Sequence, residues 1–512
     1  NTNNESTAYR VADVLDEFGG ISGINYANTS RFDTWVNRGH LVYYSETASA
    51  VNSRGVYDRK NSNSDGGKGD YLLTSYDKSA VGWGAVASDA WQRTLDRDNS
   101  MGEFVWTGFD YIGEPTPWNG TSSGAQGVWP NSPKSSYFGI IDTNGIPKDT
   151  YWFYQSQWDE DVTTLHLLPG SWNEEDLVFG SNDDVEVVVY SDAPVIKLYL
   201  NGEEVGTATS TEQVTEGGNY TYRTWTSGTG CYSQASGRHQ SLYATFWVPY
   251  EAGTLEVKAF EADGVTEIAG VNGAGLSDVS QGRTSVTTTG APSRLEVEAD
   301  RAAIDADGDD LSYITISVLD AAGEPVNTDD VEISLSIEGD GEIVGVDNGR
   351  QPDHTSYQSL QRNTGAGKLV AVVQSTEDAG SFTVTAAADG VTAGSVTVTT
   401  QPVESGGTDN SIVSYTISRY HYVQLGNAPE LPETVTVTYR DGSTEEKTVL
   451  WNAYDESLID QVGSFTVTGT IEGTNTTVTV NITMLDSVAA LLNYSAAVQV
   501  GSTVSLPSSR PA

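Results

Sequence analysis

The first third of the chain alternates between helix-like and strand-like hydrophobic patterns. Apolar residues recur at helical spacing over residues 8–18, and Gly19-Gly20 follows them, so a helix ending at these glycines is predicted. A second helix is predicted over residues 88–98, with Ser88 as its N-cap and Trp91 on its apolar face.

Three apolar runs in the same region predict buried strands. They lie at residues 21–26, 41–45 and 102–106. Strands and helices that alternate at this spacing predict parallel βα units. Three strands cannot close a barrel, and an open parallel sheet of this size would leave an apolar face and an edge uncovered. The pattern therefore fits either a small doubly wound domain or the last part of a barrel whose first strands precede Asn1.

From about residue 160 the hydrophobic period changes from helical to alternating. Strands are predicted at residues 185–190, 195–200, 242–248 and 254–260, and Asn201-Gly202 is a strong signal for a type I′ hairpin turn. Pro292 opens a second all-β segment. Its predicted strands lie at residues 295–299, 313–319, 331–337, 368–373, 382–387 and 396–399. Short strands separated by turn residues are typical of an immunoglobulin-like sandwich.

A repeat marks the end of the chain. The pattern V-Q-x-G-x-x-x-x-L-P begins at Val423 and again at Val498, 75 residues apart, which is the length of one sandwich module. We therefore predict a mixed fold, in which the βα segment, either a small doubly wound domain or a partial (β/α)8 barrel, is followed by several all-β immunoglobulin-like modules. The predicted domains are residues 1–158, 159–290, 291–403, 409–486 and 487–512, the last being the start of a further repeat.

Composition narrows the possible partners. The 512 residues include 70 acidic and 26 basic side chains, for a net charge of −44. Such a field repels nucleic acid and anionic membranes, whereas a neutral sugar is unaffected by it. Cys231 is the only cysteine, so no intrachain disulfide can form, and no apolar run is long enough to span a bilayer.

Glu46 is the first candidate for chemistry. It ends an apolar strand and precedes a loop of small residues, and a carboxylate at the carboxyl end of a barrel strand lies on the face where barrel active sites are built. Glycoside hydrolysis needs two carboxylates. The sequence offers a good candidate for only one of them.

Several motifs resemble the last part of the catalytic barrel of glycoside hydrolase family 2, in particular large secreted bacterial β-galactosidases. The motifs are Gly23–Tyr26, Ser45–Ser49, Ser53–Tyr57, Glu103–Trp118 (EFVWTGFDYIGEPTPW), Phe138–Lys148, Tyr151–Trp158 and His166–Pro169. The resemblance covers about residues 8–400. It implies a retaining mechanism in which Glu46 is the nucleophile.

The same resemblance places the acid/base glutamate outside this sequence. In the family it belongs to an Asn-Glu pair that ends an earlier barrel strand, and that strand would lie before Asn1. Asn4-Glu5 is rejected as a substitute because no apolar strand precedes it. We therefore expect the N-terminal portion of the same enzyme to be a required partner, and we expect this chain to be inactive alone.

Six further residues are predicted to bind the sugar. Tyr26 is placed to donate a hydrogen bond to Glu46, with Asn25 beside it, and Trp106 offers an indole face for a galactose ring. The predicted loop after Trp106 carries Asp110, Glu114 and Trp118. Carboxylates there would hold sugar hydroxyls through charge-assisted hydrogen bonds.

No cofactor or metal is predicted. The segment Asp305–Asp309 mimics a calcium loop, but its glycine comes too early and Ile316 replaces the closing glutamate, so a polar turn is predicted instead. The expected ligand is a galactoside oligosaccharide or glycan, and the expected location is secreted or at a bacterial cell surface. The alternatives are a β-glucuronidase, β-mannosidase or fucosidase of the same family, or a noncatalytic surface array that binds glycans.

Overall fold

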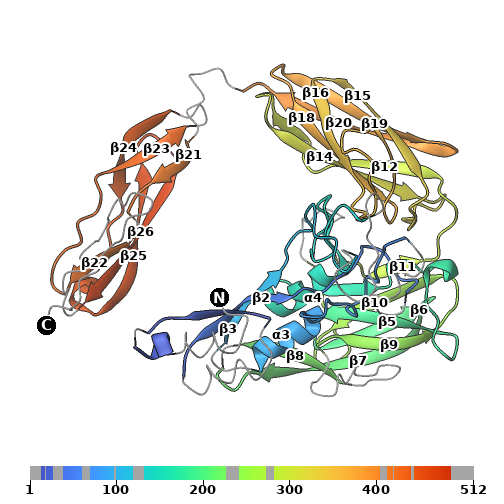
Figure 1. Ribbon diagram of the computed structural model, residues 1–512, viewed down its shortest axis with the longest axis horizontal. Coiled ribbons are helices and arrows are strands. Elements are labelled where there is room, and N and C mark those ends of the chain that lie inside the picture. Colours follow the sequence, from blue (N-terminus) through green and yellow to red (C-terminus); the bar gives the residue numbers. More distant parts are fainter. Residues whose placement is uncertain are drawn as a thin grey trace. The chain divides into compact units, whose positions relative to one another are not determined.

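The structure is a computed structural model that forms two compact units, Asn1–Val403 and Glu404–Ala512, each described here by itself (Figure 1). It describes residues 13–17, 19–26, 39–59, 70–96, 100–118, 132–218, 220–226, 242–272, 282–403, 412–418, 420–439, 443–474 and 476–485. The single division falls at the predicted linker between residues 403 and 409. The other domain boundaries stay predictions.

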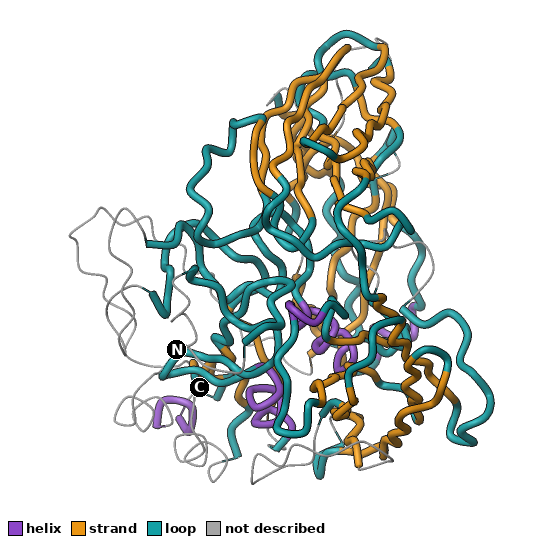
Figure 2. Tube along the Cα trace, turned by 90° about the vertical axis from the view of Figure 1, so that its right-hand side faces the viewer, coloured by secondary structure: helices purple, strands orange, loops and turns teal. Residues whose placement is uncertain are grey.

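A three-stranded parallel sheet begins the first unit. Its strands are β1 (Ser22–Asn25), β2 (Val42–Ala48) and β3 (Ser100–Trp106), in that order. All three predicted strands are therefore confirmed, as is their parallel arrangement. Within the helix predicted over residues 8–18, residues 13–17 are helical. Residues 8–12 and 18 lie outside the described residues. Between β2 and α3 (Ala87–Leu95), the described residues 49–59 and 70–86 form turns and loops, as do residues 107–118 and 132–148 between β3 and α4 (Asp149–Trp158); loops are teal in Figure 2.

The helix predicted over residues 88–98 is α3 (Ala87–Leu95), and its capping differs from the prediction. Ser88 lies inside the helix. The Asp77 carboxylate accepts hydrogen bonds from the Ala87 amide at 2.7 Å, the Ser88 amide at 3.0 Å and the Ser88 hydroxyl at 2.6 Å. A negative charge at a helix N-terminus satisfies amides that lack partners within the helix and complements the helix dipole. The cap thus comes from a neighbouring loop, which helical periodicity does not reveal.

The first sandwich follows α4 (Asp149–Trp158). One sheet contains β4 (Leu165–Leu168), β5 (Asp184–Ser191) and β9 (Ala244–Pro249); the other contains β6 (Val195–Leu200), β7 (Glu203–Val214), β8 (Thr221–Thr226), β10 (Thr254–Phe260) and β11 (Ser285–Thr287). Trp172, Val187 and Leu198 are fully buried between the sheets. Asn201 and Gly202 join β6 to β7 with φ angles of 53° and 84°, which confirms the type I′ turn.

The second sandwich has its own core. Its strands are β12 (Arg294–Ala299), β13 (Ala303–Asp305), β14 (Leu311–Leu319), β15 (Glu332–Gly339), β16 (Gly341–Asp347), β17 (Gln361–Asn363), β18 (Lys368–Ser375), β19 (Gly380–Ala388) and β20 (Val391–Gln401). All six strands predicted here are confirmed. Ile314, Ile316 and Phe382 are fully buried because alternate residues of each strand face inward.

The second unit is a six-stranded β module. Its strands, β21 (Ile412–Thr416), β22 (Tyr420–Gln424), β23 (Thr434–Tyr439), β24 (Thr444–Trp451), β25 (Gly463–Ile471) and β26 (Thr477–Leu485), are ordered β21-β23-β24-β25-β26-β22. Val437, Ile471 and Val480 are fully buried. The second copy of the repeat, beginning at Val498, lies outside the described residues. The chain as a whole is mostly β structure with few helices.

Candidate active site

The carboxyl ends of the three parallel strands gather the first candidate residues. Asn25 on β1 pairs with Glu46 on β2, and Ala48 on β2 pairs with Trp106 at the end of β3. The Tyr26 amide donates to the carbonyl of Glu46 at 3.0 Å. Parallel strands present their carboxyl ends at one edge of a sheet, so four of the predicted site residues meet there.

Tyr26 lies beside the Glu46 carboxylate, within hydrogen-bonding reach of it. The Ser49 hydroxyl donates to the Tyr26 oxygen at 2.8 Å, which fixes the phenol from the other side. Burial, together with the charges of Glu46 and Glu114, raises the pKa of Tyr26, and the Ser49 hydrogen bond only partly offsets this. Tyr26 therefore stays protonated at neutral pH and can donate to a carboxylate.

A second chain of contacts leads from Trp106 to Glu114. The Trp106 Nε1 donates to the Tyr111 oxygen at 3.2 Å, and the Tyr111 hydroxyl donates to the Glu114 carboxylate. The two rings meet edge to face, with centroids 6.0 Å apart. Burial and the hydrogen bond to Glu114 raise the pKa of Tyr111. Glu114 is exposed with a positive φ of 44°, so its carboxylate is accessible to a ligand.

Asp110 is buried and paired within the protein. Its side chain is 1% exposed and forms an ion pair with Lys148 at 2.5 Å. It also accepts hydrogen bonds from the Ser136 hydroxyl at 3.0 Å, the Gly139 amide at 2.8 Å and the Gln351 amide group at 3.3 Å. Both carboxylate oxygens are thus engaged by the protein. Asp110 was predicted to hold sugar hydroxyls, and in the structure its carboxylate is occupied by these protein groups instead.

Trp118, also predicted to bind the sugar, is a core residue in the structure. It is 5% exposed and packs in a cluster with Val51, Leu73 and Tyr137. The Tyr71 ring meets it edge to face at 5.6 Å. The loop from Trp106 to Trp118 therefore turns back into the core at its end, whereas Phe109, Ile112 and Glu114 stay exposed.

A buried polar cluster fastens this region to the first sandwich. Asp149 accepts hydrogen bonds from the Tyr57 hydroxyl at 2.8 Å, His166 Nε2 at 2.7 Å and Arg283 at 3.0 Å. The Arg283 amide donates to His166 Nδ1, so the imidazole is neutral, and burial lowers the pKa of His166 to about 4. Trp152 stacks on the same ring at 3.9 Å. The cluster has structural roles rather than access to a ligand.

Sequence reasoning missed the residues that support the site. Tyr111, Ser49 and Lys148 lie inside the quoted motifs. No local sequence pattern, however, shows which side chain each of them contacts. Arg54, which lies in the quoted Ser53–Tyr57 motif, donates from its Nε to Asp142 at 2.6 Å and is therefore an ion-pair partner. Gln351 is separated from its partners by most of the chain, so only the fold reveals it.

Among the described residues, no group of three or more His, Cys, Asp or Glu side chains could hold a metal ion. In the same part of the chain, no helix is long and apolar enough to cross a membrane. The site itself consists of acidic and aromatic side chains. Such a surface suits a neutral ligand with apolar faces and hydroxyl groups.

Family models match three segments. Residues 295–397 match the glycoside hydrolase family 2 C-terminal domain 5, residues 182–267 a domain of unknown function (DUF4982), and residues 416–474 a bacterial Ig-like domain (group 4). In the same order, these segments fall in the second sandwich, the first sandwich and the second unit. The matches confirm the resemblance to glycoside hydrolase family 2.

Two relatives are similar in sequence. The chain is 29% identical over 322 residues to the β-galactosidase BoGH2A of Bacteroides ovatus, which covers 63% of this chain and 31% of that protein. It is 29% identical over 286 residues to a Formosa agariphila protein provisionally named β-glucuronidase, covering 55% of this chain and 22% of that protein. The match thus spans less than a third of either relative.

A solved β-glycosidase from Bacteroides vulgatus is similar in structure. It has a TM-score of 0.56 and 20% sequence identity, and the match covers 78% of this chain and 49% of that one. At this identity the likeness concerns the fold alone.

Proposed function

We propose that this chain is the C-terminal part of a retaining β-galactosidase of glycoside hydrolase family 2, with Glu46 as the nucleophile. The observation that carries the proposal is the meeting of Asn25, Tyr26, Glu46 and Trp106 at one edge of a parallel sheet. The similarity to a Bacteroides ovatus β-galactosidase supports the choice of sugar.

In this mechanism Glu46 attacks the anomeric carbon and displaces the leaving oxygen, which gives a covalent galactosyl-enzyme. A nucleophilic carboxylate must stay ionised, and the protonated Tyr26 hydroxyl can stabilise it by hydrogen bonding. The acid/base glutamate would come from the N-terminal portion of the same enzyme. Protonation of the leaving oxygen typically contributes about 10²–10⁴-fold to the rate.

The parallel sheet would be the last three strands of a (β/α)8 barrel. Exposed apolar side chains on the sheet and next to it support this view. Met101 and Phe104 on β3 are 52% and 66% exposed, and Ile21 and Leu41, which immediately precede β1 and β2, are 50% and 49% exposed. Large exposed apolar side chains can mark a surface that another part of a protein covers. The remaining barrel strands are the natural occupants of that surface.

Galactose is preferred over glucuronate on electrostatic grounds. Glu46 and Glu114 face the open site, and the chain carries a net charge of −44, so a sugar carboxylate would be repelled. Trp106 would stack on the apolar face of galactose, and Glu114 would accept from its hydroxyls. The name of the Formosa agariphila relative makes β-glucuronidase the second candidate.

The β modules after the barrel would space or anchor the enzyme outside the cell. The match of residues 416–474 to a bacterial Ig-like domain supports this use of the second unit. We propose a secreted or cell-surface location on that basis.

The proposal is tested with a polypeptide that includes the N-terminal portion. Glu46→Gly should lower turnover of an aryl β-galactoside by about 10³-fold or more, because no covalent intermediate can form. Added azide should restore turnover and release an α-galactosyl azide, since azide enters from the face that Glu46 occupied. Glu203→Gln, an exposed glutamate on β7, is the matched control.

Two results would contradict the proposal. A β-galactosyl azide would identify the variant as one that lost the acid/base group instead. Faster turnover of the matching β-glucuronide by the unmodified enzyme would replace the galactosidase assignment with the second candidate.

A further inference from the structure

A loop of the second sandwich reaches into the core of the candidate active-site region. It consists of residues 348–351, which follow β16, and its last residue, Gln351, is 1% exposed. The Gln351 side chain is as buried as those of the hydrophobic core. In sequence, however, it lies more than 200 residues after β2 and β3.

Gln351 bridges the two loops that leave the strand ends. Its side-chain carbonyl accepts from the Ser53 hydroxyl at 3.0 Å, and its amide group donates to the Asn52 carbonyl at 3.2 Å. Both partners lie on the loop that follows Glu46. The same amide group donates to Asp110 at 3.3 Å, on the loop that follows Trp106.

Lys148 completes the bridge from the other side. Its ammonium group donates to the Asn52 carbonyl at 3.0 Å and forms the 2.5 Å ion pair with Asp110. Two side chains, one from each side, thus hold the same pair of acceptors. A buried polar network with its hydrogen bonds made rigidifies the segments that it joins, whereas an unpaired buried group is costly.

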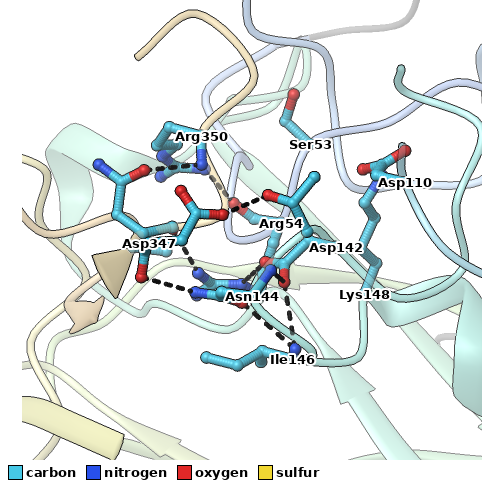
Figure 3. A network of polar contacts seen from close by, with 12 residues as sticks. Ser53, Arg54, Asp110, Asp142, Asn144, Ile146, Lys148, Asp347 and Arg350 are labelled. Atoms are coloured by element: carbon cyan, nitrogen blue, oxygen red, sulfur yellow. Dashed lines mark hydrogen bonds and ion pairs between the residues drawn. The ribbon is translucent and has the colours of Figure 1, made fainter. Parts of the chain in front are cut away.

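The inserted loop is itself fixed in place. Arg54 donates to the Asn348 carbonyl at 3.0 Å while its Nε binds Asp142 at 2.6 Å (Figure 3). Gly349 has a positive φ of 72°, and a Cβ there would lie 2.2 Å from the Asp142 carboxylate. The approach is therefore close enough to require glycine, and Gln351 has little freedom to shift.

We propose that Gln351 is a positioning residue for the active site, acting from the second sandwich on the loops after Glu46 and Trp106. The proposal rests on the proposed function. Its physical basis is that a displacement of about 1 Å at reacting groups can cost about 10²-fold in rate. On this view the second sandwich is a required part of the catalytic apparatus, and its loop sets the distance between nucleophile and sugar platform.

The test compares variants of the polypeptide that includes the N-terminal portion. Gln351→Met keeps the length of the side chain but removes the amide group, so the two loops lose their bridge. We expect kcat to fall about 10- to 100-fold with little change in KM, by the same positioning argument. Gln358→Met is the matched control, because Gln358 is exposed on the same segment, and it should behave as the unmodified enzyme.

Labelling with an activated 2-deoxy-2-fluoro-galactoside separates positioning from folding. A positioning role predicts slower labelling with one label per chain in the end, because every folded site still reacts. Fewer labels per chain at an unchanged rate would show a purely structural role and overturn the proposal. Ser53→Ala removes only one hydrogen-bond partner of Gln351, so it should give the same pattern with a smaller decrease in the labelling rate. This variant tests the proposal if Gln351→Met folds poorly.

The outcomes for the two proposals are distinguishable. No label on the unmodified enzyme would contradict the proposed function itself. If the unmodified enzyme is labelled and the Gln351→Met variant is labelled at the same rate, the proposed function stands. The positioning role of Gln351 is then contradicted.

Discussion

The parallel sheet and the second sandwich differ in how much of their apolar surface they bury. In the sandwich Phe382 is fully buried with Ile314 and Ile316, and the two faces of its sheets close on a common core. In the parallel sheet Phe104 is 66% exposed and Met101 is 52% exposed. The sandwich thus buries its hydrophobic side chains within its own core, whereas the sheet leaves large apolar side chains exposed for another part of a protein to cover.

This difference separates what each region can do alone. A domain with its own core can fold independently, but a parallel sheet is normally buried on both faces. The catalytic candidates lie on the region that is not self-sufficient, and the best-packed region supplies Gln351 to them. The comparison therefore predicts that damage to the two regions has different consequences.

The largest effect is expected from a matched pair of phenylalanine truncations. Phe382→Ala should destabilise the second sandwich by about 3–5 kcal/mol, since it leaves a cavity in a closed core. Phe104→Ala should cost less than about 1 kcal/mol in this chain, because its ring is mostly exposed. Proteolysis in increasing urea, with peptides from each region followed by mass spectrometry, measures both. Equal losses of stability in the two variants would contradict this comparison.

Loss of the buried cluster between the two kinds of region should have the next largest effect. Asp149→Ala leaves Arg283 and the Tyr57 hydroxyl without their shared acceptor, so we expect about 3 kcal/mol of destabilisation. The measurement is the urea midpoint for peptides of α4 and β4, and exposed Asp161→Ala is the control. If both variants unfold alike, the cluster does not fasten the sheet region to the first sandwich.

A further effect depends on pH and concerns Glu103 on β3, whose pKa burial raises to about 8 while hydrogen bonds from Thr94 and Thr47 work against the rise. A carboxyl with a folded-state pKa above its unfolded value of 4.5 binds its proton more tightly when folded. Stability from this group is complete below pH 4.5 and is lost as the pH rises to about 8.

Glu103→Gln should remove that pH dependence, because the amide cannot ionise. The urea midpoint of the sheet region, measured from pH 5 to 9, should fall in the parent and stay flatter in the variant. Glu338→Gln, exposed on β15, should keep the parent's slope. An identical slope in parent and Glu103→Gln would mean that Glu103 is ionised throughout.

Local sequence patterns predicted much of this fold because they depend on near neighbours. Alternating apolar residues located the strands of both sandwiches, and Asn201-Gly202 gave its turn because only that backbone geometry suits the twist of a hairpin. The position of Glu46 near the carboxyl end of β2 was predicted for the same reason. An apolar strand followed by small residues places a carboxylate at a strand end.

Contacts between distant segments were beyond such patterns. Asp77 caps α3 in place of Ser88, and nothing near Asp77 in sequence announces a helix start. Asp110 and Trp118 lie in a segment with the turn-like composition of an exposed loop, but Lys148, Gln351 and the Tyr71 ring bury them. Tertiary partners decide the burial of a loop residue, so composition alone misplaced these two side chains.

The most direct test of the central claim is covalent trapping in a polypeptide that includes the N-terminal portion. The enzyme is incubated with an activated 2-deoxy-2-fluoro-β-galactoside, digested, and searched for the labelled peptide by mass spectrometry. The account predicts a single galactosyl label on Glu46 and none in the Glu46→Gln variant. A label on a different carboxylate, or inactivation without any label near β2, would contradict Glu46 as the nucleophile.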